Sequence, residues 1–260
     1  MSERAIFDSL KNLPLPEVRF YPETGSTNQD ALDWAAQGAP DLALIVADHQ
    51  TAGRGRLGRS WFTPPGAALA FSLILRPALP QPDLLPLYSP LGALSVAIAL
   101  EQIYALQPLI KWPNDVLLNQ RKVCGVLAES LWQGNGLQAV VLGIGINVAP
   151  ASVPPPDQVL FPATCVEDAV GTTVNRWHLL AEVLKTVIHW RDLLTTPSFL
   201  TGWQQRLAFK GEKVRLENPG GETFEGILLG INPFGHLRLK MNDGSEQTFT
   251  VGDLKLRPLS

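Results

Sequence analysis

The stretch Leu137-Gln-Ala-Val-Val-Leu-Gly-Ile-Gly-Ile-Asn147 decides the fold of this chain. It is an almost continuous apolar run, which is typical of a strand in a sheet covered on both faces or filled on one. Gly143 and Gly145 lie two residues apart, so both expose bare backbone on one face, and a glycine inside a strand weakens it. We therefore predict a buried strand with a closely fitting group on its glycine face and the Asn147 amide at its end.

Apolar runs before this strand predict further strands over residues 42–47, 67–75, 109–112 and 123–130. Helical periodicity predicts helices that begin after Ser26, near Pro90 and after Asn175, and a shorter helix over 198–207. Ser26 and Gln29 have the spacing of a capping box. The proline-rich segment 149–163 is expected to be a loop. These elements predict an α/β domain.

The composition changes at Phe209, where short strands and turn signals replace helices. The predicted strands are 214–217, 224–231, 237–241 and 247–251. Asn242-Asp-Gly244 has the sequence of a tight hairpin connection. About 50 residues of strands predict a small SH3-like or OB-like barrel. We place the domains at 1–208 and 209–260.

Bulk properties exclude several classes of protein. The chain has 260 residues, 45% of them hydrophobic and 17% charged, and a formal net charge of −3. This acidic balance argues against general nucleic-acid binding. Its two cysteines, Cys124 and Cys165, fit a reducing cytosol. The uncharged run 84–100 has the composition of a membrane span, but Pro86 and Pro90 interrupt it, so a buried helix is expected. We expect a soluble cytoplasmic protein.

A basic glycine-rich stretch, Ala52-Gly-Arg-Gly-Arg-Leu-Gly-Arg-Ser-Trp61, points to an anionic ligand. From Asp48 to Trp61, three arginines and one aspartate give a local charge of +2. Arginine forks match carboxylate and phosphate oxygens, and glycines let the backbone approach a ligand. No Walker spacing occurs, and Pro64-Pro65 stands where a dinucleotide-binding helix would continue. A solvated basic loop is the alternative.

Lys111-Trp-Pro-Asn-Asp115 gathers polar groups at the end of a predicted strand, where α/β proteins often bind ligands. A surface turn is the alternative. Lys122 precedes another apolar run, either as a phosphate-binding charge or as a solubilising residue. Gly125 would let a ligand approach that run closely. Cys124 is expected to be a small core residue rather than a nucleophile.

Taken together and in this order, these segments resemble the biotin protein ligases. The matching motifs are Gly25-Ser-Thr-Asn28, residues 50–61, Lys111-Trp-Pro-Asn-Asp115, Lys122-Val-Cys-Gly125 and Gly143-Ile-Gly-Ile-Asn147. The likeness runs from about Leu13 to the C-terminus. It implies an α/β catalytic domain of the biotin/lipoate ligase type, with a mixed sheet, plus a small SH3-like barrel. It also implies that ATP and Mg²⁺ serve to join biotin to AMP. Biotin then passes to one lysine of the carboxyl-carrier protein of acetyl-CoA carboxylase.

The resemblance also implies roles for individual residues. The implied biotin-binding residues are Ser26, Thr27, Asn28, Gln50, Arg54, Gly55, Arg56, Lys122, Gly125 and Gly143. The implied ATP and adenylate residues are Arg56, Arg59, Trp61, Lys111, Asn114, Asn147 and Arg257. The implied catalytic residues are Arg54, Lys122 and Asp115, and no metal ligand is implied. Asp115 is expected either to deprotonate the acceptor lysine or to orient it.

Two departures and several alternatives accompany the resemblance. Leu57 stands where better-known members carry another arginine, so a looser grip on the intermediate is expected. The residues before Leu13 are too few for a DNA-reading domain, so we expect a ligase without repressor activity. A lipoate or octanoyl ligase is the nearest alternative, and a non-catalytic binding module is the other. No nucleic-acid or membrane partner is expected, and strand edges leave a homodimer open.

Overall fold

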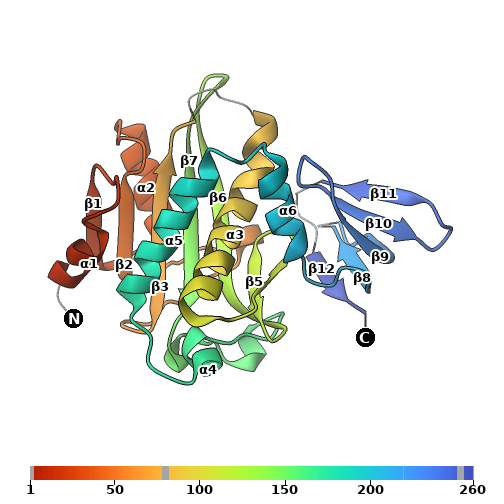
Figure 1. Ribbon diagram of the computed structural model, residues 1–260. Helices are drawn as coiled ribbons and strands as arrows, with labels where there is room; N and C mark the ends of the chain where they lie inside the picture. The colour runs from red at the N-terminus through yellow and green to blue at the C-terminus, as the bar shows by residue number, and fades with distance from the viewer. Residues whose placement is uncertain (1–2, 78–81, 219, 251–254, 260) are drawn as a thin grey trace.

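The computed structural model describes residues 3–77, 82–218, 220–250 and 255–259 (Figure 1). Within these residues the larger sheet has seven strands in the order β1-β2-β3-β7-β6-β5-β4. Its strands are β1 (Val18–Thr24), β2 (Leu44–Gln50), β3 (Ala68–Leu75), β4 (Leu109–Lys111), β5 (Asp115–Leu118), β6 (Arg121–Gln133) and β7 (Gly136–Asn147). The pair β1–β2 is parallel and all other pairs are antiparallel. The predicted mixed sheet is confirmed.

The central strand β7 carries different residues on its two faces. Val140, Leu142, Ile144 and Ile146 belong to the main apolar core on one face. On the other face, Ala139 and Val141 pack in a smaller apolar cluster. Gly143 and Gly145 continue that second face. The sheet is therefore covered on both sides, and the second face becomes bare backbone where the glycines lie.

Helices cover the two faces unequally (Figure 1). Packed on the main core are α1 (Glu3–Leu10), α3 (Leu85–Tyr104), α5 (Arg176–Arg191) and α6 (Pro197–Gln205). On the opposite face, α2 (Thr27–Ala36) contacts β2, β3, β6 and β7. The short α4 (Val166–Val170) follows the loop after β7. Because α2 is short, part of this second face stays open for a site.

The apolar run around α3 forms a core helix. The segment Pro82–Tyr104 is long and apolar enough to cross a membrane, yet 67% of its most apolar window is buried inside the protein. The helix begins at Leu85 rather than near Pro90, so the predicted start is wrong. Pro86 lies in the first turn, where an intrahelical N–H bond is not required.

Other helix starts were predicted with mixed success. Asn175 caps α5 as expected, since its side chain accepts hydrogen bonds from the N–H groups of Trp177 and His178. Ser26 occupies the N-cap position of α2 but makes no side-chain cap bond. Gln29 instead donates to Asp33 at 2.8 Å, so the predicted capping box is wrong. The segment 149–163 holds only two single-turn 3-10 helices, Pro150–Ser152 and Pro156–Gln158, and is otherwise a loop, as predicted.

The C-terminal part is all-β, as predicted, with a five-stranded antiparallel sheet. Its order is β11-β10-β9-β8-β12, with β8 (Lys213–Glu217), β9 (Thr223–Ile231), β10 (Leu237–Met241), β11 (Glu246–Phe249) and β12 (Lys255–Pro258). The predicted strand end at Val251 lies outside the described residues. The Trp112 indole N–H donates to Gly235 O at 3.0 Å and joins the two sheets. The domain boundary at 208/209 stays a prediction.

Candidate active site

The site is built on one row of residues that runs across five strands of the larger sheet. Ala70, Gly145, Gly125, Asp115 and Lys111 lie directly opposite one another on β3, β7, β6, β5 and β4. Three small residues are thus followed by a carboxylate and an ammonium group. The same face of the sheet therefore offers a flat, apolar platform at one side and a pair of charges at the other.

Trp61 packs directly against this platform. A Cβ added at Gly145 would overlap the indole ring, and a Cβ at Gly125 would come within 3.1 Å of it. The loop that carries Trp61 is closed by two backbone hydrogen bonds, from Trp61 N to Gly53 O at 2.8 Å and from Gly55 N to Arg59 O at 2.6 Å. The closely fitting group predicted for the glycine face is therefore the indole of the basic loop.

The charged side of the row is a cluster of two lysines and one aspartate, in which Lys111 and Asp115 are buried and Lys122 is half-buried. Lys122 Nζ lies 2.6 Å from Asp115 Oδ1, and Lys111 Nζ lies 3.3 Å from Asp115 Oδ2. Burial alone raises the pKa of Asp115, but the charges of Lys122 and Lys111 and their hydrogen bonds outweigh it and hold the pKa well below its usual range. Burial lowers the pKa of Lys111, and Asp115 opposes that shift only in part.

The turn before Asp115 is fixed from both sides. Asn114 Nδ2 donates to Val126 O at 2.7 Å, and Arg56 Nη1 donates to Asn114 Oδ1 at 3.2 Å. Lys111, Asn114 and Asp115 are all buried, so the alternative of an exposed surface turn is wrong. Asp115 is the first residue of β5 rather than part of the turn. We call Lys111, Asp115 and Lys122, together with Arg56 and Asn114, the charged end.

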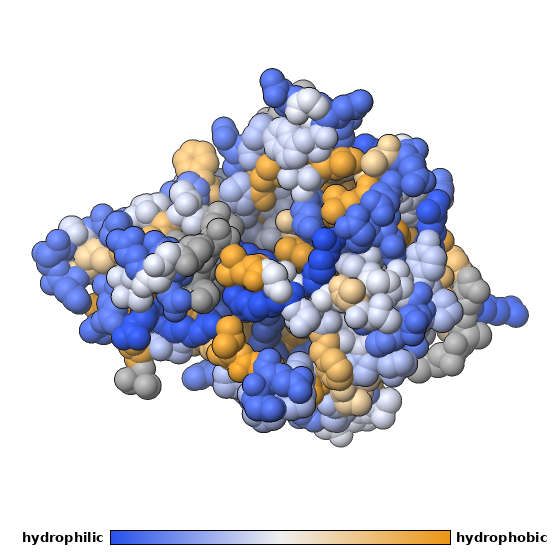
Figure 2. Space-filling view, turned by 180° about the vertical axis from the view of Figure 1, so that it is seen from behind, coloured by the Kyte–Doolittle hydropathy of each residue, from blue (hydrophilic) through white to orange (hydrophobic). Residues whose placement is uncertain are grey.

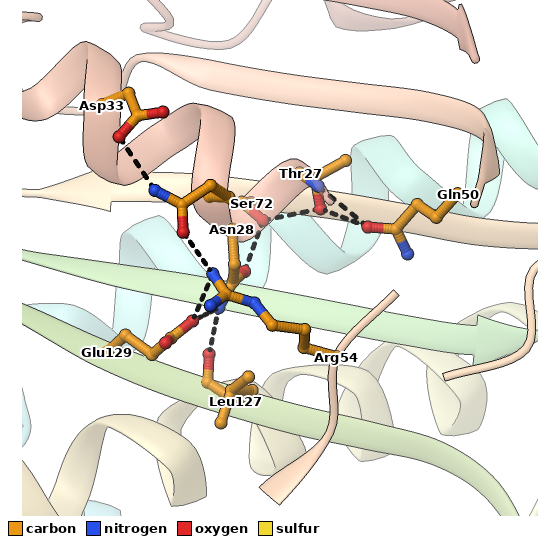
Figure 3. Close-up of polar contacts among 9 residues, drawn as sticks. Thr27, Asn28, Asp33, Gln50, Arg54, Ser72, Leu127 and Glu129 are labelled. Atoms are coloured by element: carbon orange, nitrogen blue, oxygen red, sulfur yellow. Dashed lines mark hydrogen bonds and ion pairs between the residues drawn. The ribbon is translucent and has the colours of Figure 1, made fainter. Parts of the chain in front are cut away.

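A second group of polar side chains lies where α2 begins, beside β3 (Figure 3). Gln50 Oε1 accepts a hydrogen bond from Thr27 N at 2.9 Å and lies 3.1 Å from Thr27 Oγ1. Ser72 Oγ lies 2.8 Å from Thr27 Oγ1 and 2.6 Å from Asn28 Oδ1. All four side chains are uncharged and buried. We call Thr27, Asn28, Gln50 and Ser72 the neutral end.

Asn28 and the charged Arg54 connect the neutral end to β6. The Asn28 amide crosses the bare backbone of Gly143, where an added Cβ would overlap it. Its Nδ2 donates to Leu127 O at 3.2 Å and to Glu129 Oε2 at 2.8 Å. Arg54 reaches the same carboxylate at 3.7 Å and donates to Gln29 Oε1 at 3.1 Å (Figure 3). The Arg54 guanidinium is thus held by residues of β6 and α2.

Two cavities meet at this site, on the face of the molecule that Figure 2 shows, where hydrophilic and hydrophobic residues adjoin around a hollow. The first encloses about 110 Å³ between the neutral and charged ends. The second, of about 750 Å³, extends to the loop 154–163. Trp61 and Lys122 line both, as do Lys111, Asp115 and Arg257. The indole is therefore part of the lining that the two cavities share.

The structure brings nearly all of the predicted site residues together. Lining the first cavity are Ser26, Thr27, Asn28, Gln50, Arg54, Gly55, Arg56, Arg59, Trp61, Lys111, Asn114, Asp115, Lys122, Gly125, Gly143 and Arg257. Asn147 lines the second cavity and donates from Nδ2 to Thr164 O at 3.0 Å. Cys124 is fully buried, and burial raises the pKa of its thiol, as expected of a core residue.

Three residues of the site were not predicted. Ser72 is the only polar residue of β3. A single polar residue in an otherwise apolar strand could have identified it as a site residue from the sequence. Glu129 lies on the same face of β6 as Gly125, four residues away, but only the strand register reveals its neighbours. Phe161 lines the second cavity, with Lys111 Nζ 5.1 Å and the Arg257 guanidinium carbon 6.0 Å from its ring centre. Nothing in its loop sequence distinguishes it.

Comparisons with known proteins show what this chain is similar to. Residues 21–147 match the family model described as "Biotin/lipoate A/B protein ligase family", and residues 210–257 match "Biotin protein ligase C terminal domain". The "Bifunctional ligase/repressor BirA" of Bacillus subtilis is 34% identical over 261 residues, which cover 98% of this chain and 79% of that protein.

Further relatives give the same result. The biotin–acetyl-CoA-carboxylase ligase of Paracoccus denitrificans is 37% identical over 230 residues, 84% of this chain and 91% of that one. The structure of the Aquifex aeolicus biotin protein ligase in complex with biotin and ATP has a TM-score of 0.81 at 30% identity, and the match covers 94% of this chain and 100% of that one. The predicted fold class is therefore confirmed, and the chain belongs to the biotin protein ligase family.

Proposed function

We propose that this protein is a biotin protein ligase that joins biotin to AMP and then transfers biotin to a lysine of a carboxyl-carrier domain. One observation carries the proposal: a single cavity is neutral and hydrogen-bonding at one end and cationic at the other. Biotin has the same division, with a neutral urea ring at one end and a carboxylate at the other. The ATP phosphates add the remaining negative charge.

The neutral end suits the urea ring. A small-molecule site fixes orientation with a few convergent polar groups in an otherwise apolar slot. Thr27, Asn28 and Gln50 supply these groups, with Ser26 beside them. The bare backbone at Gly143 lets the Asn28 amide lie against the strand, and that at Gly125 admits the Lys122 side chain and the Trp61 ring. We assign the polar groups and the two glycines, with Gly55 of the basic loop, to biotin.

The charged end suits the first chemical step. A carboxylate oxygen of biotin forms a bond to the α-phosphorus of ATP, and the bond to pyrophosphate breaks. Two anions must be brought together, which is mainly a task of positioning and charge neutralisation. Lys122 lines both cavities and Arg56 lines the first one. We assign these two residues to the carboxylate and the α-phosphate. Arg54 assists from the neutral side.

Asp115 is assigned an orienting role. Both of its oxygens are engaged by lysines, and its pKa is held well below the usual range, so it is a poor base near neutral pH. In the second step the acceptor lysine nitrogen attacks the biotinyl carbonyl carbon, and AMP leaves. Asp115 keeps Lys122 and Lys111 in place for both steps. The acceptor amine must therefore lose its proton to another group or to water.

The second cavity is assigned to the nucleotide. Its volume and its combination of polar and apolar lining residues suit a base and a ribose. Its lining includes Asn147, Trp61 and Arg59. Burial, together with the nearby charge of Arg59, lowers the pKa of Arg257 from the smaller domain. Such a desolvated guanidinium is well placed to bind a phosphate. The nucleotide would thus contact both domains.

Mg²⁺ is proposed to arrive with ATP. Among the described residues no group of three or more His, Cys, Asp or Glu side chains could hold a metal ion. Mg²⁺ usually keeps several waters and binds through substrate phosphates rather than in an all-protein cage. The ion would offset phosphate charge, and the protein residues that approach the phosphates would be cations rather than carboxylates.

The test is transfer of labelled biotin to a biotin carboxyl-carrier domain, with and without ATP and Mg²⁺. ATP-dependent labelling of one lysine supports the proposal. Pyrophosphate release with biotin and ATP separates an enzyme from a non-catalytic binder. Acceptance of octanoate or lipoate in place of biotin would contradict the assignment of the neutral end and favour the lipoate branch of the fold.

A further inference from the structure

The turn between β9 and β10, residues 232–236 of the smaller domain, is braced by its own hydrogen bonds. The Asn232 side-chain oxygen accepts from the N–H groups of Phe234 and His236 at 2.9 and 3.0 Å. The Asn232 N–H also donates to His236 O at 2.9 Å. These bonds hold the turn together as one unit, and we call residues 232–236 the docking turn.

Gly235 is the residue at which the docking turn meets the larger, N-terminal domain. Its backbone φ is +78°, a conformation that favours glycine. A Cβ added here would lie 2.9 Å from Leu87 Cδ2 and 3.1 Å from the Trp203 ring. Leu87 and Trp203 are both buried, so neither side chain has free space to move into. A side chain at this position must therefore push the turn away from the larger domain.

Two side chains of the larger domain bind backbone carbonyls at the docking turn and at the end of β9. Trp112 Nε1 donates to Gly235 O at 3.0 Å. Gln204 Nε2, on the helix α6 beside the smaller domain, donates to Ile231 O at 2.8 Å (Figure 1). Trp112 belongs to the segment 111–115, which carries part of the charged end. The smaller domain is thus fixed directly to that segment.

The same small sheet carries Arg257 into the site. Arg257 lies on β12, which pairs with β8, and β8 pairs with β9, the strand that leads into the docking turn. Its guanidinium carbon lies 6.0 Å from the centre of the Phe161 ring, and Lys111 Nζ lies 5.1 Å from the same centre. Burial lowers the pKa of Lys111, Asp115 opposes that shift, and the nearby charge of Arg257 adds to it. The way the small sheet is seated therefore sets the distance from Arg257 to the charged end.

We propose that the docking turn is a positioning element that sets where Arg257 lies in the nucleotide part of the site, and that Gly235 is the residue on which this depends. The inference rests on the proposed function, in which Arg257 binds a phosphate of ATP. Neither Gly235 nor Gln204 is among the described residues that line the two cavities, so both act on ATP through the small sheet. A misplacement of about 1 Å, caused far from the reacting atoms, can lower a rate about a hundredfold.

A matched pair of glycine variants tests the docking turn. Gly235→Ala must shift the turn, whereas Gly244→Ala, in the turn between β10 and β11, has a similar φ of +84° and its added Cβ meets no described atom within 4 Å. The backbone strain is similar in both, so the contact with the larger domain is what differs. We expect Gly235→Ala to raise the KM for ATP at least about fivefold, measured by pyrophosphate release at saturating biotin. Gly244→Ala should leave this KM within about twofold of wild type.

The kinetic pattern separates positioning from general damage. A partly unfolded enzyme loses active sites, which lowers kcat and leaves the KM for ATP unchanged. A displaced Arg257 raises the KM for ATP, while the dissociation constant for biotin, measured without ATP, should stay within about twofold because the neutral end is untouched. If Gly235→Ala fails to fold, Gln204→Leu, which removes the donor to Ile231 O, should raise the KM for ATP about threefold.

A double variant tests whether the effect runs through Arg257. Arg257→Ala alone should raise the KM for ATP, and adding Gly235→Ala or Gln204→Leu should raise it less than about twofold further, because the displaced group is already absent. Fully additive effects, or an unchanged KM for ATP in Gly235→Ala and Gln204→Leu, overturn the role of the turn alone.

Two further outcomes reach beyond the turn. An Arg257→Ala variant with the wild-type KM for ATP overturns the role of the turn together with the assignment of Arg257 to the nucleotide. A wild-type protein that releases no pyrophosphate from biotin and ATP refutes the proposed function itself, and with it the assignment on which the turn depends.

Discussion

The neutral and charged ends of the cavity lie on the same sheet but are held in place by opposite means. At the neutral end, Thr27, Asn28, Gln50 and Ser72 fix one another through directed hydrogen bonds. At the charged end, Lys111 and Lys122 are held by one carboxylate, that of Asp115. Hydrogen-bond direction discriminates between ligands, whereas buried charge acts on anions of any shape. Selectivity and rate are therefore assigned to different ends.

The largest effect is expected where one residue supports two charges. Asp115→Asn leaves the buried Lys111 and the half-buried Lys122 facing each other without a carboxylate, and it should lower the free energy of unfolding by about 3–5 kcal/mol. Because the folded-state pKa of Asp115 lies below its usual value, its stabilising contribution is present above the unfolded pKa and is lost as pH falls through the folded pKa. Denaturant unfolding from pH 8 to pH 3 measures this difference.

The difference between Asp115→Asn and wild type should stay constant from about pH 8 to pH 5 and narrow below about pH 4. A variant as stable as wild type at pH 7 would contradict the account of the charged end. Asp157→Asn, in the loop after β7, is the control and should leave stability unchanged, since its side chain is exposed.

Lys122→Ala tests whether the charged end supplies rate. We expect pyrophosphate release to slow by about a hundredfold or more, because a fixed cation near the developing charge is lost. The protein should still fold. Lys185→Ala, which removes an exposed helix cation, is the control. Near-normal turnover in Lys122→Ala would remove this residue from the mechanism.

Gly143→Ala tests the neutral end without touching a charge. The added methyl group overlaps the Asn28 amide, which must move away from Ser72 and Glu129. Biotin affinity is expected to fall about tenfold, as measured by calorimetry. Gly136→Ala lies on the same strand, where the added methyl group would meet the end of the flexible Gln138 side chain and would lie at an ordinary contact distance from Gln133 O, and it should leave affinity unchanged. Equal affinities in the two variants would argue against a rigid neutral end.

The smallest effect is expected in the basic loop. Leu57 is 42% exposed and has a φ of 60°. Leu57→Arg adds a cation near the bound adenylate and should slow its release only a few-fold at low salt, because an exposed charge is screened. Release of labelled adenylate would be followed at low and high salt, with Leu57→Gln as the uncharged control. A change that persists at high salt would point to a packing effect instead.

Prediction from sequence succeeded where the residue type alone determines the local structure. The glycines of β7 and the long apolar runs of β3 and β7 indicated a buried sheet with one bare face. It was less successful where a side chain could choose between partners. Gln29 had the spacing to cap α2, but its amide is used by Asp33 and Arg54 instead.

Long-range pairing explains the remaining omissions. Glu129 is an ordinary strand residue until the register places it beside Asn28, which is 101 positions away in the chain. The strands β1, β5 and β12 were not predicted: β5 and β12 have four residues each, β1 is interrupted by Pro22, and the positions of all three depend on the strands they pair with. Such residues are identified only after the sheet order is known.

Trp61 has a consequence for the life of the reaction product. The indole lines both the cavity assigned to biotin and the one assigned to the nucleotide, and it rests on glycines that place no side chain beneath it. Two separate substrates can each occupy one compartment with the ring in place. Their covalent product spans both compartments, so bond formation changes how the compartments are connected. The adenylate, which occupies both compartments beside the indole, cannot leave by the route that biotin or ATP takes alone. The loop that carries Trp61 then retains the reactive intermediate in the site.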